Sequence, residues 1–420
     1  MFADVAAATA VVLCLGVGVT LLADLYLIAV HLRRRGRAIA DERASLHGLA
    51  SVKERDSVCV QLTVFNESRS VSSAVDALCA LDWPSTRLEI MVLDDSTDET
   101  SGIAAANIAA WRRRGVNVRH LQRTSRDGYK AGALAFGFEQ TSAEFIAVFD
   151  VDYRPPRDFL AKCMSALAKA PRAAFVQARL DYRNRDSNTL TRAQAMQLDI
   201  YYAFEQAGRH WAGIPTPFNG TCGVWRRTAI SDAGGWKSNS VTEDLDLSFR
   251  AFARGWDSLN LVTIVVEGEL PESSEALASQ RRRWSAGTSG TIYALPWNVL
   301  RHLRWDRAAI FGMLCLNHAL QTIALPVILM AAISSWIVDP TAGAIALTAL
   351  AVVLALIVGL KSAGAVLACI VTGRGIRRDF PGNILRMWVM EACLIPSRSK
   401  AQLEGLMRRQ LPFMRTFKKG

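Results

Sequence analysis

The sequence lacks any arrangement of cysteines that would hold a zinc ion or a disulfide framework. Its eight cysteines are scattered along 420 residues, without a Cys-x-x-Cys pair and without a histidine partner at ligand spacing, which excludes both. We expect them to be small buried residues in a reducing compartment. The Gly-x-x-x-x-Gly-Lys-Ser/Thr order of a P-loop is also absent, which excludes that class of nucleotide-binding site.

Acidic residues are in short supply relative to basic ones. The chain has 38 Asp and Glu against 49 Lys and Arg, a formal charge of +11. The basic residues cluster beside apolar runs, where the cytoplasmic flanks of membrane helices explain them better than nucleic acid does. We therefore expect no nucleic-acid partner. With 51% hydrophobic residues, the chain can hold one catalytic domain and several membrane segments.

An apolar run near the N-terminus extends from Val5 to Leu32 and is broken only by Asp24 and small polar residues. About 20 helical residues cross the ~30 Å hydrocarbon core, so this run can span a membrane. A cleaved signal peptide is the alternative, but no basic region precedes the run and it exceeds an h-region in length. The basic block at 31–37 then predicts a multi-pass protein of the cell membrane with its catalytic domain in the cytoplasm.

Between residues 58 and 264, short apolar strands alternate with amphipathic helices, which predicts a mainly parallel sheet covered on both faces. Three strands are expected at 58–64, 88–93 and 145–149. Acidic residues follow each of them, at the ends where open α/β sheets bind ligands. They are Glu67 after the first strand, Asp94 and Asp95 after the second, and Asp150 and Asp152 after the third.

Two further segments carry candidate chemistry. Asp150 and Asp152 could give a divalent metal its hard oxygen ligands beside a diphosphate; the alternative is an Asp-rich turn. Glycines flank Lys130 at the start of an expected helix, where backbone amides and an ammonium could meet an anion. The stretch 241–250 could place Asp244 at a helix start as a general base. Its alternative role is an N-cap, filled by Thr242 or Asp244.

Four separated motifs together resemble the membrane-embedded family 2 glycosyltransferases, a group that includes cellulose, hyaluronan and mannan synthases. The motifs are Asp94-Asp95, Asp150-Val151-Asp152, Thr242-Glu243-Asp244 and Gln280-Arg281-Arg282-Arg283-Trp284. Segments 126–134 and 218–226 are similar to the mannan and glucomannan synthase-like branch and its bacterial relatives. The resemblance implies an α/β fold of the GT-A type, a Rossmann-like mixed sheet, with interfacial helices and a multi-span α-helical membrane region.

The resemblance also implies a function, an inverting β-glycosyltransferase that moves a hexose from UDP-glucose or GDP-mannose to a growing β-glucan or β-mannan. Asp244 would take the proton from the acceptor hydroxyl, and Asp150 and Asp152 would bind Mg²⁺ or Mn²⁺. The nucleotide sugar would be held by Glu67, Asp95, Lys130, Asp150, Gln280 and Arg283. The glycan or lipid acceptor would be bound by Asn219, Gly220, Thr221, Glu243 and Trp284.

Several parts of this interpretation have alternatives. The turn at 218–221 could simply join a strand to a helix, and Arg281 and Arg282 could extend to lipid head groups. Thr63 also stands where the family usually has proline. A catalytically silent sugar-nucleotide-binding subunit is a further alternative, against which the intact set of Asp152, Asp244, Arg283 and Trp284 argues.

The expected domain boundaries follow from the apolar runs and the motifs. They are an N-terminal transmembrane helix at 1–35, the glycosyltransferase domain at 55–270, interfacial helices at 271–306, transmembrane helices at 307–373 and a cytoplasmic or interfacial segment at 374–420. Spans are expected at 311–338 and 342–372, and a segment too short to span at 384–395.

The C-terminal part leaves the product open. The tail at 411–418 resembles the gating loop of the polymer synthases, or else is a basic tail on anionic lipid. About three spans is fewer than those synthases usually carry. Transfer of one or a few sugars to a lipid or a short glycan therefore stays open, as does a channel completed by a homo-oligomer or a partner subunit.

Overall fold

The computed structural model describes residues 2–46, 56–238, 242–293, 340–376 and 378–407, together with isolated positions between 301 and 337. Its centre is a seven-stranded sheet in the order β3-β2-β1-β4-β6-β5-β7. The strands are β1 Val58–Val64, β2 Leu88–Asp94, β3 Val118–Gln122, β4 Phe145–Asp150, β5 Ala173–Tyr182, β6 Gly223–Arg226 and β7 Asp257–Gly268. The three strands predicted from the sequence are confirmed to within one residue.

Most neighbouring strands are parallel, but β6 runs antiparallel to both β4 and β5. Alternate residues of β1 face opposite sides of the sheet, as the period of two requires. Val58, Val60 and Leu62 join one hydrophobic core, whereas Cys59 joins the other. Buried apolar cores on both faces explain why the strands read as nearly continuous hydrophobic runs.

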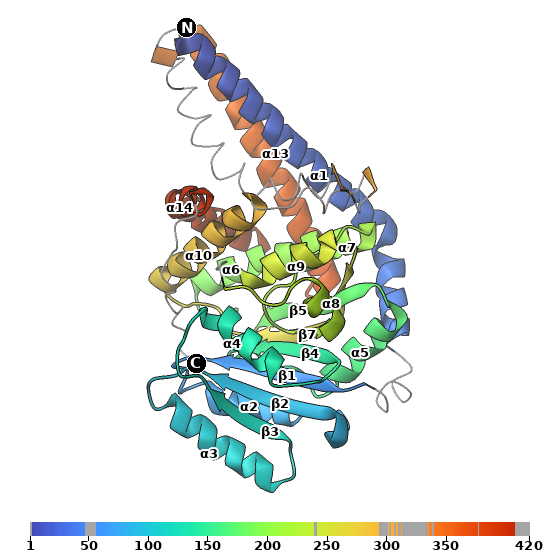
Figure 1. Ribbon diagram of the computed structural model, residues 1–420. Helices are drawn as coiled ribbons and strands as arrows, with labels where there is room; N and C mark the ends of the chain where they lie inside the picture. Colours follow the sequence, from blue (N-terminus) through green and yellow to red (C-terminus); the bar gives the residue numbers. More distant parts are fainter. Residues whose placement is uncertain are drawn as a thin grey trace.

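Helices cover both faces of this sheet (Figure 1). The first core contains residues of α2 Val71–Cys79, α3 Thr100–Arg113 and α5 Phe159–Lys169. The second contains residues of α4 Tyr129–Glu139, α7 Ala207–Ala212, α8 Arg227–Asp232 and α9 Glu243–Ala253. The remaining short elements are the 3₁₀ turn η1 Ser85–Arg87, the helix α6 Thr189–Asp199 and the π-helix η2 Ile200–Gln206 that continues it.

The long N-terminal helix α1 Phe2–Ser45 is attached to the sheet through Glu42. The β5–β7 register jumps between the pair Ala178–Leu261 and the pair Arg179–Val265, leaving three residues of β7 outside the ladder. The Glu42 carboxylate accepts hydrogen bonds from the backbone N–H groups of Val262 (3.2 Å) and Thr263 (2.8 Å). The backbone N–H groups that lie outside the ladder at the bulge therefore donate to the Glu42 side chain of α1.

Replacing Glu42 with alanine is expected to lower the free energy of unfolding by about 2–3 kcal/mol, because buried backbone donors lose a charged acceptor. Thermal or chemical unfolding of the purified protein measures it. The matched control is Asp41→Ala on the same turn, where the side chain is 72% exposed and pairs with Arg37 at 3.7 Å. Equal, small effects for both substitutions would contradict the anchoring role of Glu42.

Above the sheet, α1 and α13 Pro340–Thr372 lie side by side and project away from the sheet and the helices that cover it (Figure 1). Within the part of the chain that the structure describes, one helix is long and apolar enough to cross a membrane, over Leu350–Thr372. The predicted span at 311–338 and the Trp-rich segment before it lie mainly outside the described residues, as does the tail at 411–418. The multi-span region stays a prediction.

The segment at 384–395, expected to be too short to span a membrane and to be interfacial or re-entrant, lies within α14, a 27-residue helix over Phe380–Leu406. The helix extends past the predicted segment because its apolar face continues beyond Pro396 to the buried Ala401. The interfacial position stays a prediction. Proline removes one backbone donor but does not end a helix that is held by its packing. This helix packs against α10 Ser274–Tyr293 and α6, so it covers the motif-bearing helix α10.

Candidate active site

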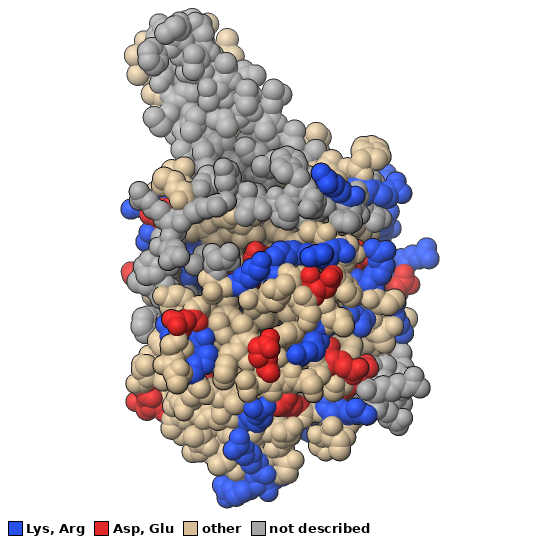
Figure 2. All heavy atoms as spheres, in the orientation of Figure 1, with Lys and Arg blue, Asp and Glu red and all other residues tan. Residues whose placement is uncertain are grey.

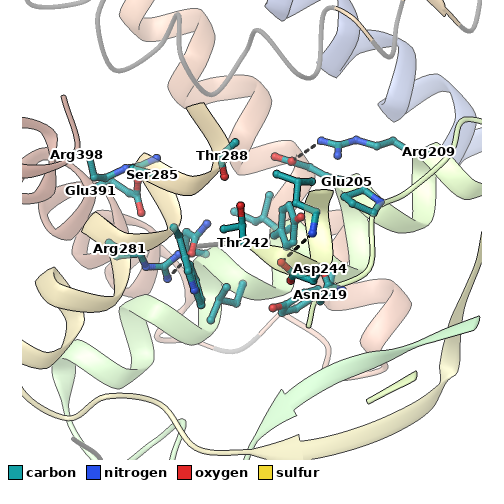
Figure 3. Close-up of a pocket in the computed structure, with 18 of the residues that line it drawn as sticks. Glu205, Arg209, Asn219, Thr242, Asp244, Arg281, Ser285, Thr288, Glu391 and Arg398 are labelled. Carbon is teal, nitrogen blue, oxygen red and sulfur yellow. Dashed lines mark hydrogen bonds and ion pairs between the residues drawn. The ribbon is translucent and has the colours of Figure 1, made fainter. Parts of the chain in front are cut away.

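Two cavities adjoin above the carboxyl ends of β1, β2 and β4. The lower one, of about 270 Å³, is enclosed by these strand ends, the start of α4 and the helix α10. The upper one, of about 360 Å³, lies among η2, α9, α10, α13 and α14 (Figure 3). All the site residues predicted from the sequence line one or both cavities. Those shared by the two walls include Asn219, Thr242, Asp244 and Trp284.

Lys130 lines the lower cavity. The turn before α4 brings it there through two residues with positive φ, Gly128 and Tyr129. Its ammonium is 2.5 Å from an oxygen of Asp150 and donates to the Gly220 carbonyl at 2.9 Å. Burial alone would lower the pKa of Lys130, but the charges of Asp150 and Glu243 outweigh it and raise the pKa. One permanently charged cation therefore joins three of the predicted motifs.

Asp150 is held at the end of β4 by two hydroxyls. The Thr221 hydroxyl accepts from the Asp150 backbone N–H at 2.9 Å, and the Thr63 hydroxyl donates to its carboxylate at 3.4 Å. Thr221 thus supports the strand end, although the sequence predicted it as an acceptor-binding residue. The family's proline at position 63 would not supply the hydroxyl.

Asp150 and Asp152 fit a divalent metal ion that takes some of its oxygen ligands from the protein and others from a diphosphate. The Asp150 carboxylate already balances the Lys130 ammonium, which shows that the position accepts a cation. Among the described residues no group of three or more His, Cys, Asp or Glu side chains could hold a metal. Mg²⁺ commonly binds one or two carboxylates plus phosphate oxygens, so two carboxylates at one cavity suffice.

Asp95 faces the lower cavity with both of its oxygens occupied. The Arg123 guanidinium donates to them at 2.9 and 2.5 Å, and only 7% of the Asp95 side chain is exposed. Arg123 also donates to the carbonyls of Asp127 and Tyr129, which fixes the turn that carries Lys130. The sequence analysis missed Arg123; a basic residue directly after β3 was the only signal for it.

Thr242 is the N-cap residue of α9, but its side chain makes no capping hydrogen bond. Asp244 lies in the first turn, where one of its oxygens accepts from the Leu245 N–H at 2.8 Å. Asp244 therefore satisfies one first-turn amide, as the capping alternative predicted, while its other oxygen takes no part in that bond. At Gly220, with φ of +78°, a Cβ would lie 2.9 Å from the other oxygen. Glycine is needed there for the backbone to approach the carboxylate.

The environment of Asp244 raises the pKa of its carboxyl toward neutral pH. Burial is the largest cause and raises its pKa to about 7, with a further rise from the negative charge of Glu243. Lys130 opposes both by lowering it. Burial likewise raises the pKa of Glu243. A carboxyl with a pKa near 7 at the junction of two cavities has the properties of a general base.

The predicted acceptor turn is held by amides that the sequence analysis missed. The Asn219 and Gln206 side chains exchange two hydrogen bonds, at 2.9 and 3.0 Å. The Asn219 backbone N–H donates to Gln177 at 2.9 Å. No sequence signal pairs these residues, because Gln206 belongs to the π-helix and Gln177 to the middle of β5. Asn219 therefore fixes the turn while its side chain lines both cavities.

The helix α10 presents the Gln-x-x-Arg-Trp motif to both cavities. Gln280 and Arg283 line the lower one and Trp284 lines both. Arg281 is buried, donates to Gln197 at 2.8 Å and stacks over the Trp284 ring at 4.8 Å. The lipid alternative is wrong for this residue, which fixes the tryptophan. The neighbouring Arg282 pairs with Glu404 of α14 at 2.9 Å, so it too has a protein partner.

Besides Asp244 and Arg281, the upper cavity has charged residues from segments without a recognised motif (Figure 3). Glu205 and Arg209 pair at 3.0 Å where the π-helix joins α7. Glu391 and Arg398 pair on α14. Lys361, on α13, was noticeable in the sequence only as a charge inside an apolar run. These residues place paired charges at the two ends of a cavity that is otherwise largely lined by apolar and aromatic side chains.

Comparisons with known proteins agree with this geometry. The family model described as "Glycosyl transferase family group 2" matches residues 145–360. Glucomannan 4-beta-mannosyltransferase 9 of Arabidopsis thaliana is 38% identical over 247 residues, which cover 58% of this chain and 46% of that protein. Glucomannan 4-beta-mannosyltransferase 2 of the same plant is 40% identical over 249 residues, covering 58% and 47%. The chain thus spans about half the length of these relatives.

A solved structure is similar across nearly the whole chain. The mannosyltransferase PcManGT from Pyrobaculum calidifontis, in complex with GDP-Man and Mn²⁺, superposes with a TM-score of 0.58. The alignment covers 93% of this chain and 100% of that protein at 18% sequence identity. At this identity the likeness concerns the fold.

Proposed function

The chain belongs to glycosyl transferase family group 2, and from this we propose that it transfers mannose from GDP-mannose to a growing β-mannan or glucomannan chain. The names of the similar plant proteins support mannosyl transfer and the 4-β linkage. The observation that carries the proposal is the place of Asp244 in the wall between the two cavities. A donor in the lower cavity and an acceptor in the upper one would meet at this carboxylate.

In the proposed reaction, the Asp244 carboxylate takes the proton from an acceptor hydroxyl. The hydroxyl oxygen attacks the anomeric carbon of the donor, on the face opposite the diphosphate. The bond between that carbon and the phosphate oxygen breaks, and nucleoside diphosphate leaves with the electron pair. A single displacement inverts the anomeric configuration. Lys130 and Arg283 oppose the charge that develops on the leaving group.

Asp150 and Asp152 would hold Mg²⁺ or Mn²⁺ in this proposal. Such an ion supplies positive charge to the diphosphate. Lys130, which balances Asp150 in this structure, would then be available to the phosphate oxygens. Glu67, Asp95 and Gln280 line the same cavity and would hold the nucleotide sugar in this proposal.

We further propose that the protein is a multi-pass membrane enzyme with its catalytic domain on the cytoplasmic face. The apolar helix over Leu350–Thr372 supports this. Figure 2 shows Lys and Arg side chains along the upper edge of the catalytic domain, below the projecting helices. Exposed Arg33, Arg34 and Arg37 follow the apolar part of α1. Basic residues beside apolar helices are typical of the cytoplasmic flank.

The kcat/KM for the acceptor is expected to fall about tenfold per pH unit below about pH 7, because the proton acceptor must be deprotonated and kcat/KM reports the pKa of the free enzyme. The raised pKa of Asp244, about 7, sets this limit. Protonation at lower pH removes the base, so activity is present above the pKa and lost below it. Initial rates at acceptor concentrations well below KM measure the profile, and donor affinity serves as the control. A flat profile down to about pH 5 would contradict Asp244 as the base.

The proposed donor is tested on the full chain purified in detergent. GDP-mannose and UDP-glucose are supplied separately with Mn²⁺ and a β-manno-oligosaccharide, and nucleoside diphosphate release is measured. We expect a higher kcat/KM for GDP-mannose and loss of release in an Asp244→Asn protein and with EDTA. Release from UDP-glucose alone would overturn the donor assignment. No release with either donor, despite nucleotide binding, would overturn the transferase.

A further inference from the structure

Two ionisable residues interrupt apolar helices, and the proposed reaction uses neither. They are Asp24 on α1 and Lys361 on α13. The structure brings them together: the Lys361 ammonium is 3.1 Å from Asp24 and 2.7 Å from Glu205 on the π-helix. Glu205 in turn accepts from Arg209 at 3.0 Å. Four charges of alternating sign therefore form a continuous chain from α1 through α13 to the wall of the upper cavity.

This chain of charges, Asp24–Lys361–Glu205–Arg209, is costly to keep. The exposed fractions of its side chains are 1%, 12%, 16% and 12% in that order. Buried ion pairs rarely add net stability, because desolvation offsets their attraction. Ionisable residues within apolar helices are for the same reason usually associated with function. A reason other than stability is needed for their presence.

The inner end of this row of four charges faces the upper cavity. Glu205, Arg209 and Lys361 all line it, as does Asp244 (Figure 3). Glu205 is fixed from both sides, because one carboxylate oxygen accepts from Lys361 and the other from Arg209. A carboxylate oxygen has two lone pairs and accepts more than one hydrogen bond. The orientation of Glu205 is thus set before any ligand arrives.

The π-helix that carries Glu205 is also packed tightly between the two long helices. A Cβ at Gly364 of α13 would lie 2.8 Å from the Phe204 ring. On the other side, a Cβ at Gly208 would lie 3.1 Å from the ring of His31 on α1. The His31 side chain donates to the Phe204 carbonyl at 2.8 Å. Residues on both long helices therefore set the position of this wall.

We propose that Glu205 is an acceptor-binding residue whose carboxylate accepts hydrogen bonds from hydroxyls of the glycan in the upper cavity, and that the Asp24–Lys361 pair positions it. The inference rests on the proposed function. The two positive and two negative charges of this row cancel one another, which suits a neutral, hydroxyl-rich ligand. A phosphate-bearing lipid would need unbalanced cations at this wall. The ligand class is therefore a neutral glycan.

The test uses the full chain in detergent with GDP-mannose and a β-manno-oligosaccharide. In a Glu205→Gln protein the acceptor KM is expected to rise about tenfold, since one charge-assisted hydrogen bond is lost. The donor KM and the slow hydrolysis of donor by water are expected to stay within about twofold. Lys361→Met is expected to raise the acceptor KM in the same way, and Lys361→Arg to restore it.

Asp181→Asn is the matched control. Asp181 is a buried carboxylate that pairs with Arg185 at 2.9 Å and with Arg374, but it is not among the residues lining either cavity. We expect this substitution to lower thermal stability without changing the acceptor KM. The comparison separates a binding role from a general effect of removing a buried charge.

The proposal is overturned if the acceptor KM of Glu205→Gln is unchanged, or if donor and acceptor KM rise equally, as a merely structural role requires. Preference for a polyprenyl phosphate over the neutral oligosaccharide would overturn the ligand class. A wild-type protein that binds donor and neither transfers nor hydrolyses it would instead overturn the proposed function itself. Hydrolysis of donor with an unaltered acceptor response in the variant would overturn only the role of Glu205.

Discussion

An Asp244→Asn protein is expected to turn over about 10²–10⁴ times more slowly than the wild type, the usual contribution of a general base. Asparagine keeps the size of the side chain and its contact with the Leu245 N–H but does not accept the acceptor's proton. Donor affinity should change little, because Asp244 lies where the two cavities meet and not among the predicted nucleotide-binding residues. Single-turnover rates and donor affinity, measured separately, test both parts.

Asp246→Asn is the matched control for this substitution. Asp246 belongs to the same acidic stretch and the same helix, but its carboxylate pairs with Arg250 at 2.7 Å and it is not among the residues lining either cavity. We expect it to keep the turnover number within about threefold, because it takes no part in proton transfer. Equal losses in both variants would point to damage to α9, and near-normal turnover in Asp244→Asn would exclude the base.

Replacing Lys130 with glutamine is expected to lower the turnover number by about 10²–10³, the effect of removing one preorganised group that stabilises developing charge. The amide keeps a hydrogen-bond donor near the Gly220 carbonyl but not the charge that balances Asp150. Donor affinity should fall as well, since the same cation is expected to face the diphosphate. Nucleotide affinity by calorimetry and turnover by diphosphate release give the two quantities.

Lys162→Gln is the control for charge removal in general. Lys162 pairs with Asp158 at 2.7 Å on α5 and is not among the cavity residues. The Lys162→Gln substitution should leave turnover and donor affinity nearly unchanged and should lower stability little, because exposed ion pairs contribute about 0–1 kcal/mol to stability. A Lys130→Gln protein with unaltered turnover and donor affinity would show that Lys130 only links α4 to Asp150 and to the Gly220 carbonyl.

The sequence predicted the strands and the acids that follow them because both depend on local patterns, whereas the other motif residues were predicted from the resemblance to a known family. Val58–Val64, Leu88–Asp94 and Phe145–Asp150 are buried apolar runs ended by acids, and such runs in an α/β chain become parallel strands. The carboxyl ends of parallel strands meet at one edge, so the acids of separate motifs had to converge there. The helix start at Glu243 followed from the acidic residues and the apolar face behind them.

The partners of these residues could not be predicted, because they are distant in sequence and carry no periodic pattern. The Arg123 side chain hydrogen-bonds to Asp95, and the Gln206 side chain hydrogen-bonds to Asn219. Only the fold brings these residues together. Lys361 and Asp24 are 337 residues apart. Each of them changes the interpretation of a residue identified from the sequence. Asp95 and Asn219 in particular act through a fixed structure as well as by facing a ligand.

The length of α14 shows a different limit. A hydropathy window ends at polar residues, whereas a helix continues as long as one face is packed. Leu394 and Ala401 are buried on either side of Pro396, and Arg282 of α10 pairs with Glu404 beyond it. Tertiary contacts therefore extend the helix past the point where composition alone predicts its end.

The most direct test of the account is the anomeric configuration of the product. The full-length protein is incubated with GDP-α-mannose, Mn²⁺ and a β-manno-oligosaccharide, and the new linkage is determined by NMR. A single displacement driven by Asp244 predicts a β-linked mannose, formed by the wild type and absent with Asp244→Asn. An α-linked product, or a mannosyl group trapped covalently on the protein, would contradict the mechanism.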